Sequence, residues 1–400
     1  MRRVVAITAL FTLGLVGVSG QLASAATSGS SRIAPIVIRP IDPSATAQPV
    51  VATDNVMHAL YELSLVNTRP APVAIDRIEV RTVDPRLTIA SYDGAVLASR
   101  LRHIDGSTLT EPVIAPGEQV FMFVDVGLYL TLALPMALDH RITIGDRQYN
   151  VAAITVDAVQ AASLASPVNG SNWVVLEGCC GPRSVHRTTV YPTEAGYSVA
   201  GRFGMDLSQM DDLGRLVTGD PTQLTSYPSY NQYVNAVAPG RVVGVVDTFA
   251  DQVPGALPPP GTFDEETSEG NSVVVELGNG QYAFYGQLRP GSIIVKSGTF
   301  VRKGQPIAQI GNSGNSSAPH LHFELLSNPD RISADGLPFV FTSFGYAGRI
   351  DSARFDFLGP AGPFAGSRLP VPQVRSLQLP LDLSILDFQS SSGSSGNPLL

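Results

Sequence analysis

Short apolar segments that alternate with polar residues recur along the chain and predict β-strands. In residues 57–67, MHALYELSLVN, apolar side chains occupy alternate positions, which is the period of a strand with one buried face. Prolines interrupt the pattern at residues 69–72. It resumes in VAIDRIEVRTV and, after an Ala-Pro-Gly turn, in EQVFMFVDVGL. This rhythm of short strands and turns predicts an Ig-like β-sandwich over residues 34–155.

A second β-rich region is predicted over residues 182–348, where apolar runs such as QYVNAVAPGRVVGVV and NSVVVELGNGQYAFYGQL contain Gly-centred turns. Within it, residues 251–271 are rich in proline and acidic residues, which favours a surface loop inserted between strands. Residues 349–400 are rich in Pro, Gly and Ser, a composition typical of a disordered or weakly docking tail. The predicted fold class is mainly β, with two domains.

The N-terminus has the pattern of a signal peptide. Arg2 and Arg3 precede an apolar core, and the small residues 23–25, ASA, supply a cleavage site. The apolar run is too short for a membrane span, so we expect export with removal of residues 1–25 and no stable transmembrane anchor. Removal would take the formal net charge from −8 to about −10. Such an acidic chain is a poor partner for nucleic acid, which binds dense Lys and Arg.

The two cysteines of the chain, Cys179 and Cys180, are adjacent. Adjacent cysteines can close a vicinal disulfide, but they cannot cross-link distant segments as the disulfides of secreted proteins do. A zinc site built on both is disfavoured, because neighbours on one backbone rarely converge on one metal. We interpret the pair as an oxidised turn between the two domains.

Two histidines lie two positions apart in the apolar run SAPHLHFEL, residues 317–325. In a strand, alternate side chains point to the same face, so His320 and His322 are expected to project side by side. Neutral imidazole is the commonest metal ligand, and catalytic zinc usually has three protein ligands. The pair therefore predicts half of a metal site.

Residues 280–325, which end in this histidine pair, resemble the core of the lysostaphin-like zinc endopeptidases, the LytM domain family. The shared pattern is a strand ending in a Tyr-x-His-Leu box, a Gly-containing hairpin, and Gly-x-Gly-x-Ser before His-Leu-His-Phe. The resemblance extends over roughly residues 185–345. It implies a LytM-type β-sheet domain with a duplicated hybrid motif, bound Zn²⁺, and cleavage of peptide cross-bridges in peptidoglycan.

The resemblance also implies roles for individual residues. The family's zinc is held by a His and an Asp from one upstream box and by the second His of the pair. Asp206 and His322 match two of these ligands, whereas Arg202 stands at the position of the first. His320 matches one of two catalytic histidines, and Gln287 replaces the other.

The two replacements have different expected consequences. Arg202 has no lone pair for a metal, so we expect it to pair with the box aspartate in place of the cation. Gln287 can donate a hydrogen bond but cannot shuttle a proton. Arg202 and Tyr285 are expected to line a binding groove. His186, upstream of the box, could restore the ligand set, but nothing in the sequence fixes its position. Glu324, on the face of the histidine pair, is more often a salt-bridged strand residue.

Three functions follow from these expectations. The first is a secreted LytM-like protein of the cell envelope that binds peptidoglycan or regulates a cell-wall hydrolase. The second is an active, divergent zinc endopeptidase that cleaves peptidoglycan cross-bridges. The third is a structural β-protein with a remnant of a metal site. The incomplete ligand set favours the first, and the intact GNSGNSSAPHLHFEL stretch favours the second.

Overall fold

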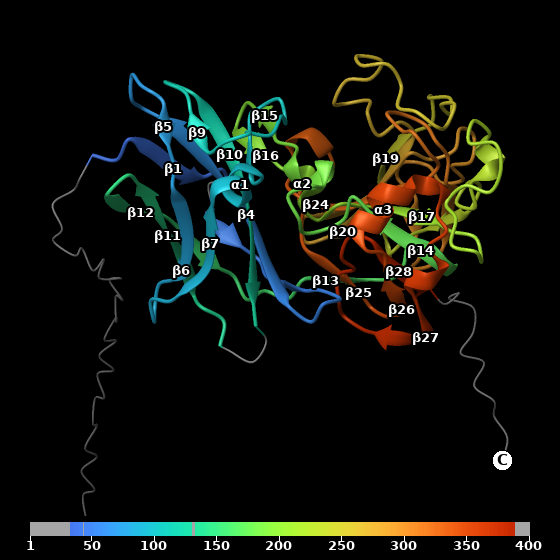
Figure 1. The fold of residues 1–400 in the computed structure, drawn as a ribbon. Coiled ribbons are helices and arrows are strands. Elements are labelled where there is room, and N and C mark those ends of the chain that lie inside the picture. Colours follow the sequence, from blue (N-terminus) through green and yellow to red (C-terminus); the bar gives the residue numbers. More distant parts are fainter. Residues whose placement is uncertain (1–32, 43, 130–132, 389–400) are drawn as a thin grey trace, which may run out of the picture. The chain divides into compact units, whose positions relative to one another are not determined.

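The computed structural model describes residues 33–42, 44–129 and 133–388. The expected signal peptide, residues 1–25, lies outside the described residues, as do residues 389–400 of the expected tail. The described chain is mainly β (Figure 1), as the alternating pattern predicted. No helix in it combines the length and apolar character that a membrane span requires.

Two five-stranded sheets form the region that the sequence predicted as a sandwich. The strands of the first sheet are β1 (Ile36–Pro40), β3 (Val50–Val51), β4 (Met57–Asn67), β8 (Leu101–Arg102) and β10 (Gln119–Leu128). Those of the second are β2 (Thr46–Ala47), β6 (Arg77–Thr82), β7 (Thr88–Asp93), β11 (Ala137–Ile144) and β12 (Arg147–Val156). Helix α1 (Gly94–Ala98) and the pair β5 (Val73–Ala74) and β9 (Val113–Ile114) complete this region. That its topology is Ig-like stays a prediction.

Strand β4 is buried on both of its faces. Its alternating residues Leu63 and Leu65 pack into the core shared by the two sheets. Glu62 points to the opposite face, yet only 2% of it is exposed. On the same outer face, Phe121 and Phe123 of β10 cluster with apolar residues between 190 and 199. The segment that follows residue 184 therefore covers the outer face of the first sheet, and a charged residue is buried beneath it.

A ten-stranded sheet dominates the rest of the described chain. Its strands in spatial order are β22 (Phe300–Val301), β19 (Gly240–Val246), β20 (Ser272–Gly278), β21 (Gln281–Gly286), β24 (Leu321–Leu326), β17 (Met205–Gln209), β14 (Gly170–Leu176), β28 (Ser384–Phe388), β26 (Phe344–Arg349) and β27 (Arg368–Arg375). Figure 1 shows the red strands β26 and β28 beside the green β14. The disorder expected from residue 349 is wrong for residues 349–388, because the apolar SILDF of β28 pairs with both β14 and β26.

Short elements connect these strands. The two-stranded pairs are β13 (Ala162–Leu164) with β25 (Phe339–Phe341), β15 (Tyr191–Thr193) with β16 (Gly196–Ser198), and β18 (Tyr233–Asn235) with β23 (Pro306–Gln309). The helices are α2 (Val185–Thr188) and α3 (Ser352–Leu358), with 3-10 turns η1 (Ala200–Phe203), η2 (Leu224–Ser226), η3 (Arg331–Ser333), η4 (Gly359–Ala361) and η5 (Ala365–Ser367). Of these, α2 and η1 matter most, because they lie in contact beside the candidate site.

Candidate metal centre

Strands β17 and β24 bring together two residues that are far apart in sequence. The strands are antiparallel neighbours, and Asp206 lies directly opposite His322 in their register. The Nδ1 atom of His322 lies 3.0 Å from Oδ1 of Asp206, within a hydrogen bond. The pairing of strands thus places the two residues that match zinc ligands side by side.

His320, the residue just before β24, borders the same carboxylate. Its Nδ1 lies 2.8 Å from the carbonyl oxygen of Ala318 and donates a hydrogen bond to it. In a neutral ring the lone pair is then on Nε2, which lies 3.5 Å from Oδ2 of Asp206. Both histidines of the pair therefore contact Asp206, one on each carboxylate oxygen.

His186 joins Asp206 and His322 in a group of three potential metal ligands. It lies on α2, where the hydroxyl of Ser184 caps the helix by accepting from the N–H of Arg187. Its Nε2 is 3.6 Å from Oδ1 of Asp206, and its ring meets that of His322 edge to face with centroids 4.5 Å apart. Donor atoms of His186, Asp206 and His322 all lie within 4.8 Å of one another. The sequence left this residue as one of two options, and the structure places it here.

Arg202 does not pair with Asp206, and that expectation is wrong. Its guanidinium donates to both carboxylate oxygens of Glu62, at 2.7 and 3.1 Å, and at 2.9 Å to Asp335. The physical reason is the buried carboxylate of Glu62, which needs a cation and reaches Arg202 from β4. Arg202 is 9% exposed and lies under the sandwich sheet instead of lining a groove.

Tyr285 also lies outside any groove. It is opposite Phe323 in the register of β21 and β24, whereas Gly286 is opposite His322. Alternation therefore turns Tyr285 away from the histidine face. Its ring is fully buried against Phe323, and its hydroxyl accepts from the N–H of Val237 at 2.9 Å.

Gln287 reaches the site through Glu269, which the sequence analysis missed. The Nε2 of Gln287 donates to Oε2 of Glu269 at 2.8 Å, and that oxygen is 3.8 Å from Nδ1 of His322. The Oε1 atom of Gln287 is buried and finds no hydrogen-bond partner among the described residues. Glu269 belongs to the acidic segment interpreted as a surface loop, and nothing in its local pattern separates it from its exposed neighbours.

Glu324 and Arg331 add a buried ion pair to the site. The Oε2 of Glu324 accepts from Nε of Arg331 at 2.9 Å, and Arg331 also lies 3.1 Å from Oε1 of Glu269. The Oε1 of Glu324 is 2.9 Å from Nε2 of His322, at an angle outside hydrogen-bonding geometry. Glu324 is therefore a salt-bridged strand residue that supports His322.

The fixed charges of this site do not balance. Three carboxylates, that of the buried Glu324 and those of the largely buried Asp206 and Glu269, face one guanidinium, that of Arg331. Two negative charges remain, and buried charge is costly unless it is compensated. Either a divalent cation or protonated histidine can supply the missing charge.

The pKa values of the site follow from this imbalance. Burial opposes charge on His322, but Glu269, Glu324 and Asp206 raise its pKa well above the ordinary histidine value. Burial alone would raise the pKa of Asp206, but His186, His320 and His322 hold it well below its usual range. Burial lowers the pKa of His186. A neutral His186 has the lone pair that a metal ligand needs.

These residues fit a zinc ion. Catalytic zinc takes three N or O ligands at about 2.0–2.2 Å in tetrahedral geometry, which sets ligand atoms about 3.3 Å apart. The spacings of 3.0 Å from His322 and 3.6 Å from His186 to Asp206 bracket that value. His186 Nδ1 and His322 Nε2 are buried without hydrogen bonds among the described residues, whereas His322 Nδ1 already points at Asp206, in the bond that a shared metal ion would replace. His186, Asp206 and His322 are therefore the candidate zinc ligands.

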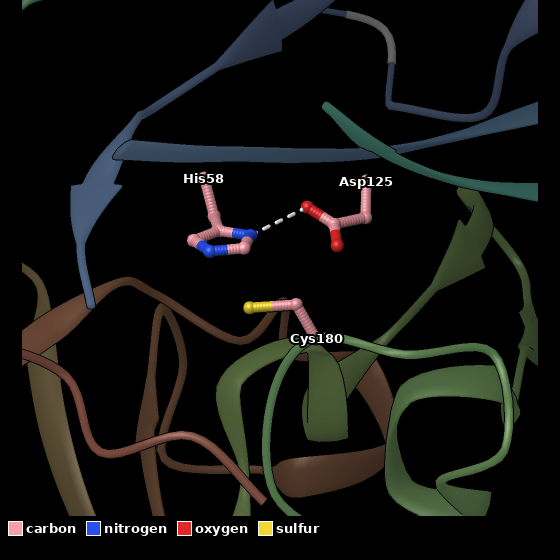
Figure 2. Close-up of side chains that lie close together, drawn as sticks. All are labelled: His58, Asp125 and Cys180. Carbon is pink, nitrogen blue, oxygen red and sulfur yellow. Dashed lines mark hydrogen bonds and ion pairs between the residues drawn. The ribbon is translucent and has the colours of Figure 1, made fainter. Parts of the chain in front are cut away.

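A pocket of about 630 Å³ opens beside the site, and Asp206 and His320 line it. Its other walls include the disulfide of Cys179 and Cys180, and His58 and Asp125 of the sandwich. Figure 2 shows the sulfur of Cys180 beside the His58 ring, whose Nδ1 bonds Asp125 at 2.9 Å. His58, Asp125 and Cys180 form a second group of potential metal ligands. Because Cys180 is oxidised and offers no thiolate, we assign this group to the wall of the pocket.

Comparisons with known proteins place part of this chain in a family. Residues 226–334 match the model of Peptidase family M23. Over 92 residues the chain is 38% identical to the murein hydrolase activator EnvC of Escherichia coli, covering 23% of this chain and 17% of EnvC. Over 65 residues it is 44% identical to the peptidoglycan DD-endopeptidase ShyA of Vibrio cholerae, covering 16% of this chain and 15% of ShyA.

Among solved structures, the catalytic domain of the prophage-encoded M23 protein EnpA from Enterococcus faecalis is similar at 22% identity and a TM-score of 0.23. The similar region covers 41% of this chain and 95% of the EnpA chain. Of the two curated relatives, EnvC and ShyA, the chain spans less than a fifth of the length. His320 and His322 lie inside the family match, whereas His186 and Asp206 precede it. Residues 226–334 of this chain form a peptidase family M23 domain.

Proposed function

We propose that this protein is a zinc-dependent endopeptidase that acts on bacterial peptidoglycan, with His186, Asp206 and His322 as its zinc ligands. The observation that carries the proposal is the position of His186. The family's upstream box supplies a histidine ligand, and this chain has Arg202 at that position, which cannot bind a metal. His186 takes over the role of that histidine, so the site keeps three ligands. The similarity to EnvC and ShyA supports peptidoglycan as the target.

The groups around Asp206 have separate chemical roles in this proposal. His186, Asp206 and His322 would hold the zinc ion, which would polarise a peptide carbonyl and the attacking water as a Lewis acid. The Nε2 of His320 accepts a proton from that water and returns it to the departing amine. The adjoining pocket, about 630 Å³ in volume, receives the peptide.

Gln287 lowers the expected rate. At its position the family has a second catalytic histidine, and general acid–base catalysis by such a group typically contributes 10²- to 10⁴-fold. One N–H of the Gln287 amide already donates to Glu269, which leaves one to stabilise an oxyanion. This observation favours a second candidate function, a metal-binding but non-catalytic protein that binds peptidoglycan or activates a wall hydrolase.

The protein is proposed to work outside the cytoplasmic membrane. The residues that support this are Arg2 and Arg3, the apolar core that follows them and the small residues 23–25. Peptidoglycan as a substrate requires the same location.

Zinc content and wall digestion test the proposal together. We expect the purified protein to hold about one zinc ion and to release soluble peptides from purified peptidoglycan until a chelator is added. His186→Ala should lose both properties, and His103→Ala, at the partly exposed ion pair with Glu118, should keep both. Zinc without digestion would select the non-catalytic candidate. Absence of zinc after incubation with the metal would overturn the ligand set.

A further inference from the structure

The sandwich holds the helix that carries His186. Three hydrogen bonds of the Arg187 guanidinium end on the sandwich. One goes to the carboxylate of Glu62, and two go to the carbonyl oxygens of Tyr61 at 3.2 Å and Val124 at 3.1 Å. Arg187 is 1% exposed and Glu62 is 2% exposed. A planar guanidinium fixed by bonds to three acceptors has little freedom to move.

Helix α2 has little stability of its own. It contains four residues, Val185–Thr188, and an isolated helix of one turn is unstable because its nucleation is unfavourable. Its position must come from tertiary contacts. Besides the Arg187 bonds, its backbone packs on η1 so closely that a Cβ on Gly201 would lie 2.5 Å from the carbonyl oxygen of His186. Arg187 and Gly201 thus fix α2 from two sides.

We propose that Glu62 is a positioning residue of the metal centre, which acts through Arg187 to hold His186 against Asp206. The inference rests on the proposed function. It gives the sandwich a role in the site itself. It also accounts for Arg202, which occupies the position of the missing ligand and binds the same carboxylate as Arg187. The contact of Glu62 with Arg187 and Arg202 then serves to place the third ligand, His186.

The expected effect has a known scale. Losing a group that orients a metal ligand from outside the coordination sphere typically costs 10- to 100-fold in metal affinity. Arg187→Lys keeps the charge opposite Glu62 but cannot make the forked bonds to Glu62, Tyr61 and Val124 together. We expect it to weaken zinc binding by 10- to 100-fold.

The experiment measures zinc affinity of the full-length protein by competition with a chromophoric chelator, and the visible absorption of its Co²⁺ form. The matched control is Asp335→Asn, which alters the Arg202 side of the Glu62 cluster without touching α2. We expect Arg187→Lys to bind zinc 10- to 100-fold more weakly with an altered Co²⁺ spectrum, and the control to bind within about twofold of wild type.

Two further variants keep the test decisive. If Arg187→Lys fails to fold, the double variant Glu62→Gln with Arg187→Gln removes both charges together and leaves Arg202 paired with Asp335. Gly201→Ala should displace α2 and lower affinity without altering any charge. Wild-type affinity in a folded Arg187 variant would overturn the positioning role while the zinc site stands. Absence of zinc in the wild type would instead overturn the proposed function.

Discussion

Two buried charge clusters lie close together in this molecule, and they differ in their balance. In the first, two carboxylates meet two guanidiniums, and its members are Glu62, Asp335, Arg187 and Arg202. In the second, three carboxylates meet one guanidinium, and its members are Asp206, Glu269, Glu324 and Arg331. The first cluster is complete and joins the sandwich to the segment around α2. The second keeps two negative charges that no guanidinium balances, beside three histidines.

The difference teaches how a candidate metal site can be recognised when its motif departs from the family pattern. Arg202 in the upstream box suggests a site in which an arginine has replaced the metal. The contacts contradict that arrangement, because Arg202 binds Glu62 in the balanced cluster and leaves Asp206 without an arginine. A buried excess of two negative charges is the feature that calls for a dication. Charge balance is therefore more informative here than the motif.

The largest expected effect comes from unbalancing the first cluster. Glu62→Gln leaves Arg187 and Arg202 buried with one carboxylate, and removing one partner of a buried ion pair typically costs about 3–5 kcal/mol. Urea denaturation should show a fall of that size in the free energy of unfolding. The exposed Glu111→Gln should change it by less than about 0.5 kcal/mol. A loss in Glu62→Gln no larger than in that control would contradict the balanced cluster.

Zinc should stabilise the second cluster by a comparable amount. A ligand at about 1,000 times its Kd raises the free energy of unfolding by about 4 kcal/mol when it binds only the folded state. We expect this rise in wild type and its absence in Asp206→Asn, because the carboxylate between the two histidines is gone. Asp335→Asn, in the balanced cluster, should keep the rise. Equal stabilisation of both variants would show that zinc binds elsewhere.

The sequence predicted the strands well, because their signal is local. Alternation identified MHALYELSLVN as β4 and predicted that His320 and His322 project together, and both side chains border Asp206. The prediction of disorder in residues 349–388 was wrong because the signal that orders them is not local. Its Pro and Gly content indicated disorder, whereas β28 is held by pairing with β14, more than 200 residues away in sequence. Composition does not report such long-range pairing.

The candidate site could be predicted only in part. Asp206 and His322 follow from the resemblance to LytM domains. His186 does not, because no periodicity ties α2 to β17, and only the packing of α2 on Gly201 and the bonds of Arg187 bring it near. Glu269 was missed for a similar reason, since its burial depends on where an acidic loop folds back. The positions of His186 and Glu269 both depend on tertiary contacts, which local sequence patterns do not report.

A buried histidine in the sandwich sharpens the contrast with His322. The ring of His140 donates from Nδ1 to the carbonyl oxygen of Ala152 and accepts at Nε2 from the hydroxyl of Tyr61, at 2.6 and 2.8 Å. Burial lowers its pKa to about 4. The unfolded chain, with a histidine pKa near 6.5, binds the proton first as the pH falls. Stability is therefore complete above about pH 6.5 and declines toward pH 4.

The size of that decline is measurable. A difference of about 2.5 pKa units corresponds to a loss of up to about 3 kcal/mol. His140→Gln retains a donor and an acceptor but does not titrate. Urea denaturation at pH 7 and pH 4.5 should show wild type losing about 2–3 kcal/mol more than this variant. An equal loss in both proteins would mean that His140 is not held neutral.

The smallest effect is expected where a charge pair is exposed. Arg183 and Asp356 lie 2.8 Å apart, but their side chains are 72% and 52% exposed. Solvent screens such a pair, and its contribution is typically below 1 kcal/mol. Asp356→Asn should shift the free energy of unfolding by less than about 0.5 kcal/mol and leave zinc affinity unchanged. A loss approaching that of Glu62→Gln would show that distance alone, and not burial with charge balance, sets the strength of ion pairs in this protein.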